Sequence, residues 1–178
     1  MPAQPPSEAP FEAFAKCPVR VLIIGGNALI AYGSERLTQD CDCAVIALEE
    51  RDFATELGKL GYVLDDRLGS FSRYVHLSRR RPVVDLMLLD AQTFEKLWLE
   101  SREVELDGQS LRAPKPLHLV ALKLHALKEN PERMGKDWED IKYLLETARG
   151  EWTREELAEL AARYASEEIL ALLKQRYP

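Results

Sequence analysis

Two aspartates in the segment QDCDC, Asp40 and Asp42, have the residue type and the spacing of a metal site. If this segment is a strand, both carboxylates point to one face while Cys41 points to the other. Same-side positions on a strand lie roughly 6 to 7 Å apart, which suits carboxylates around divalent ions and is too long for a shared proton. The alternative is that the two acids cap a turn or pair with nearby arginines.

A third acid, Asp85, is the only charge in the apolar segment VVDLMLL. A buried acid needs a compensating partner. If this segment forms a strand next to the one that bears Asp42, the strand spacing of about 4.8 Å brings Asp85 to the same metal cluster. The alternative places Asp85 on the exposed face of an edge strand.

Gly25 and Gly26 end the apolar run VRVLIIGG shortly before these acids. Glycines at such a turn let backbone N–H groups and a helix N-terminus approach a phosphate, which a Cβ atom would obstruct. The sequence therefore predicts a phosphate-binding turn beside the carboxylates.

The elements that must position these residues follow from hydrophobic periodicity. Period-two and continuous apolar segments predict strands, and apolar residues at three- and four-residue spacing predict helices. The predicted strands are 19–26, 39–48, 61–68, 71–78 and 82–89, with a hairpin at 103–114. The predicted helices are 10–17, 27–38, 50–60, 91–100, 116–129, 136–150, 153–165 and 166–177.

Local signals refine these boundaries. Gly61 is a stop for the helix at 50–60, and Asp107 with Gly108 favours a primed turn in the hairpin. Thr153 and Ser166 are predicted N-caps of the last two helices. The chain is thus divided into a flexible arm at 1–10, a core at 11–115 and a C-terminal helical region at 116–178 that packs on the core.

The segment GGNALIAYGSERLTQDCDCAV resembles the signature of the polymerase β nucleotidyltransferase superfamily, in which a Gly-rich turn precedes a strand with paired acids. The resemblance is closest to the AbiEii-like branch and covers roughly residues 20 to 147. In that branch an Arg and a Thr precede the acids, and a helical Lys precedes a Lys-Asp-x-x-Asp segment. The matching residues are Arg36, Thr38, Lys123, Lys136, Asp137 and Asp140.

This resemblance implies an α+β, polymerase β-like nucleotidyltransferase fold with a mixed β-sheet flanked by helices and a helical C-terminal region. It implies transfer of a nucleoside monophosphate from a nucleoside triphosphate to a hydroxyl acceptor, with pyrophosphate leaving. Two Mg²⁺ ions, with Mn²⁺ as the substitute, are expected as cofactors. Asp40, Asp42 and Asp85 are the expected catalytic residues and metal ligands.

The same resemblance assigns the nucleotide contacts. They are Gly25, Gly26, Asn27, Arg36, Thr38, Lys123, Lys136 and Asp140. Lys123 and Lys136 would contact the triphosphate, and the alternative for each is a solvated lysine on a helix. Asp140 would pair with Lys136 at the i,i+4 spacing. Asn27 stands where many members of the superfamily have a serine.

The composition of the chain limits which classes of partner it can bind. The 178-residue chain has a formal net charge of −6, which argues against broad nucleic-acid binding. A local basic cluster, Arg73 with Arg79 to Arg81, is either solvated charge on a hairpin or a phosphate or polynucleotide contact. We expect a cytoplasmic protein without a membrane span, because neither a secretion signal nor a long apolar stretch is present in the sequence given.

Three acceptors stay open: tRNA, a protein side chain or a small molecule. AbiEii-like relatives are often toxins paired with antitoxins, so an antitoxin protein is a candidate partner by analogy. Two rival functions also stay open. One is a nucleotidyltransferase-like protein that binds or regulates without turnover. The other is an antibiotic nucleotidyltransferase of the aminoglycoside type, whose acidic acceptor pocket would fit the negative net charge.

Overall fold

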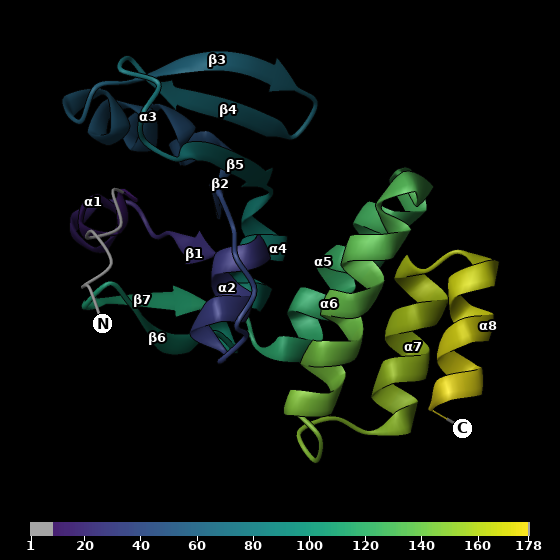
Figure 1. Ribbon diagram of the computed structural model, residues 1–178. Coiled ribbons are helices and arrows are strands. Elements are labelled where there is room, and N and C mark those ends of the chain that lie inside the picture. The colour runs from purple at the N-terminus through teal and green to yellow at the C-terminus, as the bar shows by residue number, and fades with distance from the viewer. Residues whose placement is uncertain (1–8, 178) are drawn as a thin grey trace. The chain divides into compact units, whose positions relative to one another are not determined.

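Within residues 9–177, which the computed structural model describes, seven strands form one mixed sheet in the order β3-β4-β5-β2-β1-β7-β6 (Figure 1). The strands are β1 (Leu22–Ile23), β2 (Asp40–Ile46), β3 (Tyr62–Leu68), β4 (Phe71–His76), β5 (Val83–Leu89), β6 (Arg102–Leu106) and β7 (Gln109–Ala113). The β2–β5 and β1–β7 pairs are parallel and the other pairs are antiparallel. The mixed sheet confirms the predicted fold class.

The chain divides into two compact units after Pro114. The first unit holds the sheet and the helices α1 (Phe11–Lys16), α2 (Gly25–Ala31), α3 (Glu50–Lys59) and α4 (Ala91–Leu99). The second holds α5 (Pro116–Glu129), α6 (Met134–Thr147), α7 (Arg154–Tyr164) and α8 (Glu167–Arg176). Short 3-10 helices occur at Ala47–Glu49 and Pro131–Arg133. Most of the predicted arm, residues 1–8, lies outside the described residues.

Strand β2 shows why the sheet forms where it does. Cys41 and Cys43 are buried against the core, while Asp40 and Asp42, on the alternate positions, are more exposed. This period-two pattern holds one face of the strand in the core and leaves the other face to the acids. In the core, the ring centroids of Phe14 on α1 and Phe53 on α3 lie 5.4 Å apart, so these two helices contact each other.

The strand predicted at 19–26 is much shorter in the structure. Only Leu22 and Ile23 pair as β1, and the Ile24 N–H adds one bond to the Asp42 carbonyl at 3.1 Å. Gly25 then takes a φ of +58°, which turns the chain out of the sheet and into α2. The prediction missed this boundary because the apolar run continues through residues that do not pair.

The helix predicted at 27–38 ends at Ala31. Gly33 takes a φ of +92°, and the N–H groups of Gly33 and Ser34 bond back to the carbonyls of Ile30 and Leu29. This is a glycine C-cap, so residues 34–38 leave the helix and lead to β2 as a loop.

The hairpin and the predicted caps are confirmed. Asp107 and Gly108 have φ values of 50° and 72°, which are the two positive angles of a type I′ turn between β6 and β7. Thr153 accepts a hydrogen bond from the Glu156 N–H and forms a capping box with that residue. Ser166 accepts a hydrogen bond from the Ile169 N–H.

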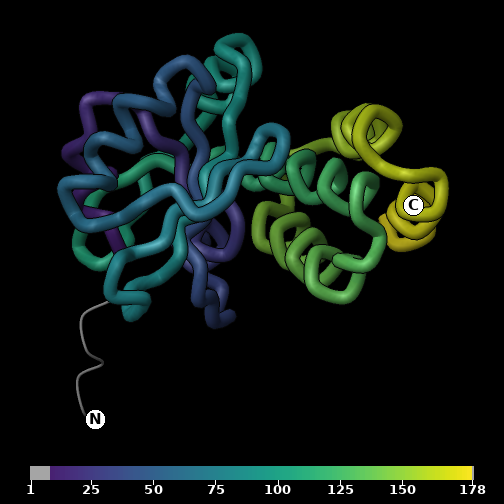
Figure 2. The backbone as a smooth tube through the Cα atoms, turned by 90° about the horizontal axis from the view of Figure 1, so that it is seen from above, coloured from purple at the N-terminus to yellow at the C-terminus, as the bar shows by residue number. Residues whose placement is uncertain are grey.

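In the second unit, helices α5 to α8 lie beside one another (Figure 2, green to yellow). Helix α5 contacts α6 and α7, and α7 contacts α8. Leu124 from α5 and Ile141 and Leu144 from α6 are almost fully buried, and Leu157 from α7 joins them in the buried set. Among residues 9–177, we find no helix with the length and apolarity that crossing a bilayer requires.

Candidate active site

Asp42 and Asp85 are neighbours on two adjacent strands. They are Cα partners on the parallel strands β2 and β5, so their side chains leave the same face of the sheet. Asp40 lies two residues before Asp42 on β2 and shares this face. Strand β5 lies between β4 and β2, so Asp85 is not on an edge strand. The three acids that the sequence singled out therefore lie on one face of adjacent strands.

The glycine turn packs against the Asp42 side chain. The Gly26 N–H points at Asp42 Oδ2 at 3.4 Å, and Gly25 leaves no room for a side chain beside that carboxylate. A Cβ atom on Gly26 would lie 2.8 Å from the hydroxyl oxygen of Thr38. Gly25 is thus required by its close contact with Asp42 and by its positive φ, whereas Gly26 packs against Thr38.

Asn27 and Thr38 hold the start of β2. The buried Asn27 side chain donates from Nδ2 to the Asp40 carbonyl at 2.9 Å, and Thr38 donates from Oγ1 to the same carbonyl at 3.3 Å. These bonds fix the backbone that carries Asp40. Arg36 lies in the loop between them, where its backbone N–H contacts Ser34 Oγ at 3.3 Å. The nucleotide contacts that the sequence assigned to these side chains stay predictions.

Arg73 on β4 binds Asp85 through one edge of its guanidinium group. Nε donates to Oδ1 at 2.7 Å and Nη2 donates to Oδ2 at 2.8 Å, in a bidentate ion pair. The Arg73 side chain is 51% exposed and that of Asp85 is 23% exposed. The hydrogen bonds and the charge of Asp85 raise the pKa of Arg73 above its ordinary value. Sequence reasoning had placed Arg73 in a basic cluster without linking it to an acid.

The acid cluster fits a divalent cation in donor type and in register. Carboxylate oxygens are the hard donors that Mg²⁺ prefers, and Asp42 and Asp85 present them from adjacent strands. Among residues 9–177, however, no three His, Cys, Asp or Glu side chains are arranged to hold a metal. The Arg73 guanidinium engages both oxygens of Asp85. A bound ion on Asp85 would bring a second cation next to this guanidinium.

The second unit contains a buried ionic cluster. Lys123 on α5 donates to Asp137 Oδ1 at 3.0 Å and to Asp140 Oδ2 at 2.6 Å, both on α6. Arg133 donates from Nε to Asp137 Oδ2 at 2.7 Å. Lys136 is exposed. Asp140, which the sequence pairs with Lys136, thus binds Lys123 across the two helices.

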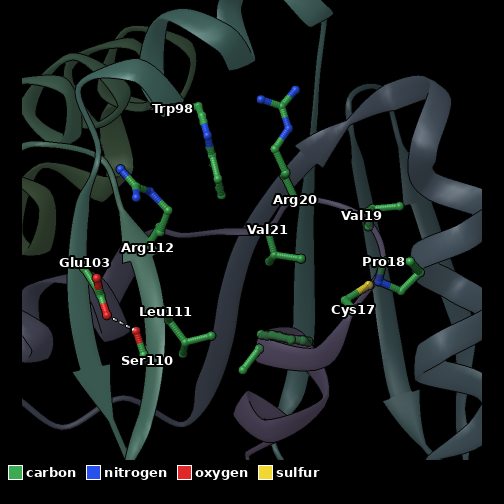
Figure 3. A pocket seen from close by; sticks show the side chains of 12 residues that line it. Cys17, Pro18, Val19, Arg20, Val21, Trp98, Glu103, Ser110, Leu111 and Arg112 are labelled. Carbon is green, nitrogen blue, oxygen red and sulfur yellow. Dashed lines mark hydrogen bonds between the residues drawn. The ribbon is translucent and has the colours of Figure 1, made fainter.

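A separate cavity of about 350 Å³ lies in the first unit beside the residues that precede β1 (Figure 3). Trp98 lies between two arginines at its wall: Arg112 is 4.9 Å and Arg20 is 5.3 Å from the ring centroid. Arg112 donates to Ser101 Oγ and Ser101 O, each at 2.8 Å, and Arg20 pairs with Glu95. Among the described residues that line the cavity, none belongs to the predicted site.

Comparison with known proteins adds structural relatives. No protein-family model and no curated protein sequence matches the chain. A crystal structure of ANT(2'')-Ia in complex with adenylyl-2''-tobramycin is similar at a TM-score of 0.68 and 16% identity, over 86% of this chain and 94% of that one. An antigenic nucleotidyltransferase-like protein from Paracoccidioides brasiliensis is similar at 0.59 and 17% identity, over 95% and 86%.

A third solved structure extends the comparison. The lincomycin-bound lincosamide antibiotic adenylyltransferase LnuA is similar at a TM-score of 0.55 and 15% identity, over 75% of this chain and 90% of that one. Likeness at such low identity establishes architecture and not substrate. The mixed sheet with its flanking helices and these structural relatives agree, and the chain has the polymerase β-like nucleotidyltransferase fold.

Proposed function

We propose that the chain is a metal-dependent nucleotidyltransferase that moves a nucleoside monophosphate from a nucleoside triphosphate to a hydroxyl acceptor. The observation that carries this proposal is the pairing of Asp42 with Asp85 on one face of the sheet, beside the turn at Gly25. Carboxylates in this arrangement are suited to phosphoryl chemistry, in which positioning and charge neutralisation supply most of the rate.

The residues of the first unit have distinct parts in this proposal. Asp40, Asp42 and Asp85 would hold Mg²⁺, which when bound supplies positive charge against the triphosphate. Asn27 and Thr38 act indirectly, because their hydrogen bonds to the Asp40 carbonyl fix the strand that carries two of the acids.

The transfer itself makes one bond and breaks one. The acceptor oxygen bonds to the α-phosphorus, the bond from that phosphorus to the bridging oxygen breaks, and pyrophosphate leaves with the electron pair. The acceptor proton goes to a carboxylate of the cluster, and Asp85 is the candidate base in this proposal. Water then takes the proton from the product complex.

Incubation with triphosphates labelled at the α-phosphate, Mg²⁺ and a cell extract tests the function. We expect one macromolecule or metabolite to become labelled, and we expect Asp42→Asn to abolish the label. Asp52→Asn is the matched control, because Asp52 is an exposed aspartate on α3. An Asp42→Asn protein that labels as well as the parent would show that the acids are wrongly assigned.

A cationic antibiotic is a second candidate acceptor. The similar structures include ANT(2'')-Ia with adenylyl-2''-tobramycin and lincomycin-bound LnuA. The net charge of −6 would also favour encounter with a cationic substrate. Incubation with tobramycin or lincomycin and each triphosphate tests this candidate, with a mass gain of one nucleotide on the antibiotic as the expected result.

The AbiEii-like part of the resemblance leads to a toxin with an antitoxin partner. Growth arrest on expression, lost in Asp42→Asn, is the expected result for a toxin. Nucleotide binding without label transfer to tRNA, protein or antibiotic would instead favour a binding or regulatory protein.

A further inference from the structure

Three charged residues lie in one row across adjacent strands. Arg73 on β4 is the Cα partner of Asp85 on β5, and Asp85 is in turn the Cα partner of Asp42 on β2. Adjacent strands are about 4.8 Å apart, and residues paired in register share a face. Across this face of the sheet, the order of charges is therefore a cation on β4, an anion on β5 and an anion on β2.

The order of charges in this row has an electrostatic consequence. Two carboxylates opposite each other on neighbouring strands repel, and a cation beside one of them relieves the repulsion. Arg73 has this position, and its two bonds to Asp85 are short and bidentate. A divalent ion between Asp42 and Asp85 would neutralise the same charges and would repel the guanidinium.

The two side chains of the ion pair differ in how freely they can move. Arg73 is half exposed at the end of a long side chain, whereas Asp85 is short and mostly covered. The guanidinium can therefore turn toward solvent while Asp85 stays in the cluster. Its charge persists over the whole working pH range, because a guanidinium is not deprotonated in proteins. A planar guanidinium released from a carboxylate is well suited to phosphate oxygens.

We propose that Arg73 is the resident cation of the acid cluster, and that it passes from Asp85 to a phosphate oxygen of the bound nucleotide when a divalent ion takes its place on Asp85. This inference rests on the proposed function, since it concerns the same acids. It assigns Arg73 a role in binding the nucleotide, and it makes metal binding and nucleotide binding mutually supportive.

Binding of Mn²⁺ to the full chain without nucleotide tests the first half. The electron paramagnetic resonance signal of free Mn²⁺ gives the dissociation constant for the parent and for Arg73→Gln. Because removal of Arg73 removes the competitor, we expect Arg73→Gln to bind Mn²⁺ about fivefold more tightly, which corresponds to about 1 kcal/mol. Equal or weaker Mn²⁺ binding by Arg73→Gln overturns the inference.

Nucleotide binding with Mn²⁺ at saturation tests the second half. Here the same substitution should weaken the affinity for ATP about fivefold, because a phosphate contact is lost. General damage to the site would weaken the binding of both Mn²⁺ and ATP. Tighter Mn²⁺ binding together with weaker ATP binding is expected only if Arg73 exchanges Asp85 for a phosphate. If Arg73→Gln leaves ATP affinity unchanged, the transfer to phosphate is wrong.

Two further variants control for folding and location. Arg51→Gln removes an exposed arginine on α3, outside the basic cluster that contains Arg73, and it should change neither affinity. In an Asp85→Asn background, Arg73→Gln should no longer tighten Mn²⁺ binding, because the carboxylate for which the cations compete is gone. Arg73→Lys keeps the positive charge but cannot form the bidentate contact with Asp85. We expect it to bind Mn²⁺ somewhat more tightly than the parent, and this variant serves as the test if Arg73→Gln folds poorly.

The outcomes for the two proposals are separable. Label transfer by the parent, together with unchanged Mn²⁺ affinity in Arg73→Gln, would end the inference about Arg73 and leave the enzyme assignment in place. Opposite shifts in Mn²⁺ and ATP affinity, without label transfer to any acceptor, would support the exchange and contradict the enzymatic function.

Discussion

The carboxylate of Asp42 occupies the space that a side chain at residue 25 would need. A Cβ atom built on Gly25 would lie 2.2 Å from Asp42 Oδ2 and 2.5 Å from its Cγ, far inside van der Waals contact. The glycine therefore has a specific partner in the acid cluster. Its role differs from that of a glycine needed only for a positive φ.

Gly25→Ala should displace Asp42 and abolish nucleotidyl transfer. Gly69→Ala is the matched control, because Gly69 has nearly the same φ, +59°, with nothing within 4 Å of a Cβ atom. Both variants should lose about 1 to 2 kcal/mol of stability from the left-handed backbone. Label transfer measures the activity and urea unfolding measures the stability. Equal activity in the two alanine variants would contradict the role of the contact between Gly25 and Asp42.

Lys123→Met should destabilise the second unit by about 3 to 5 kcal/mol, because it leaves the carboxylates of Asp137 and Asp140 buried without their shared cation. Lys136→Met, on the exposed side of α6, should change stability by less than about 0.5 kcal/mol. Urea denaturation followed by far-UV circular dichroism measures both. A similar small loss in both variants would mean that the ionic cluster contributes little.

Asp137 should make stability fall at low pH. Burial alone would raise its pKa, but the bonds from Arg133 and Lys123 outweigh burial and hold the pKa below the ordinary value. Since the folded pKa is depressed, the stabilisation is present above the unfolded pKa of about 3.9 and is lost as pH falls through the folded value. The stability difference between the parent and Asp137→Asn should thus stay constant from pH 7 to about pH 5 and shrink below about pH 4. A difference that grows in acid would indicate a raised pKa.

Thr153→Ala should cost about 1 kcal/mol, because the capping box with Glu156 satisfies two backbone N–H groups at the start of α7. Thr153→Ser keeps the hydroxyl and should retain most of the stability. Thermal unfolding of the three proteins measures the order, and a serine variant as unstable as the alanine variant would show that the hydroxyl is not what matters.

The sequence predicted the elements well where local signals govern them. The hairpin at Asp107 and Gly108 and the caps at Thr153 and Ser166 depend on residues a few positions apart, and the structure confirms them. The adjacency of Asp85 to the paired acids was predicted only on the condition that the two strands are neighbours. The β2–β5 pairing meets that condition.

Partners from distant segments were missed for a physical reason. The Arg73–Asp85 pair depends on the register of β4 against β5, which the sequence pattern alone does not set to a single residue. The tertiary partners of Lys123, Asp137 and Asp140, were missed because they lie on another helix. One signal was available: Lys123 is the only charge in the apolar run VALKLHAL, where a buried cation requires acids.

The parallel pairing of β2 with β5 also governs when the acids meet during synthesis. Asp42 and Asp85 are separated along the chain by α3, β3 and β4, so a growing chain that ends before β5 lacks one member of the pair. Non-local pairing of this kind is slow relative to hairpin and helix formation. Newly made protein should therefore bring Asp42 and Asp85 together late, after its helices and hairpins have formed.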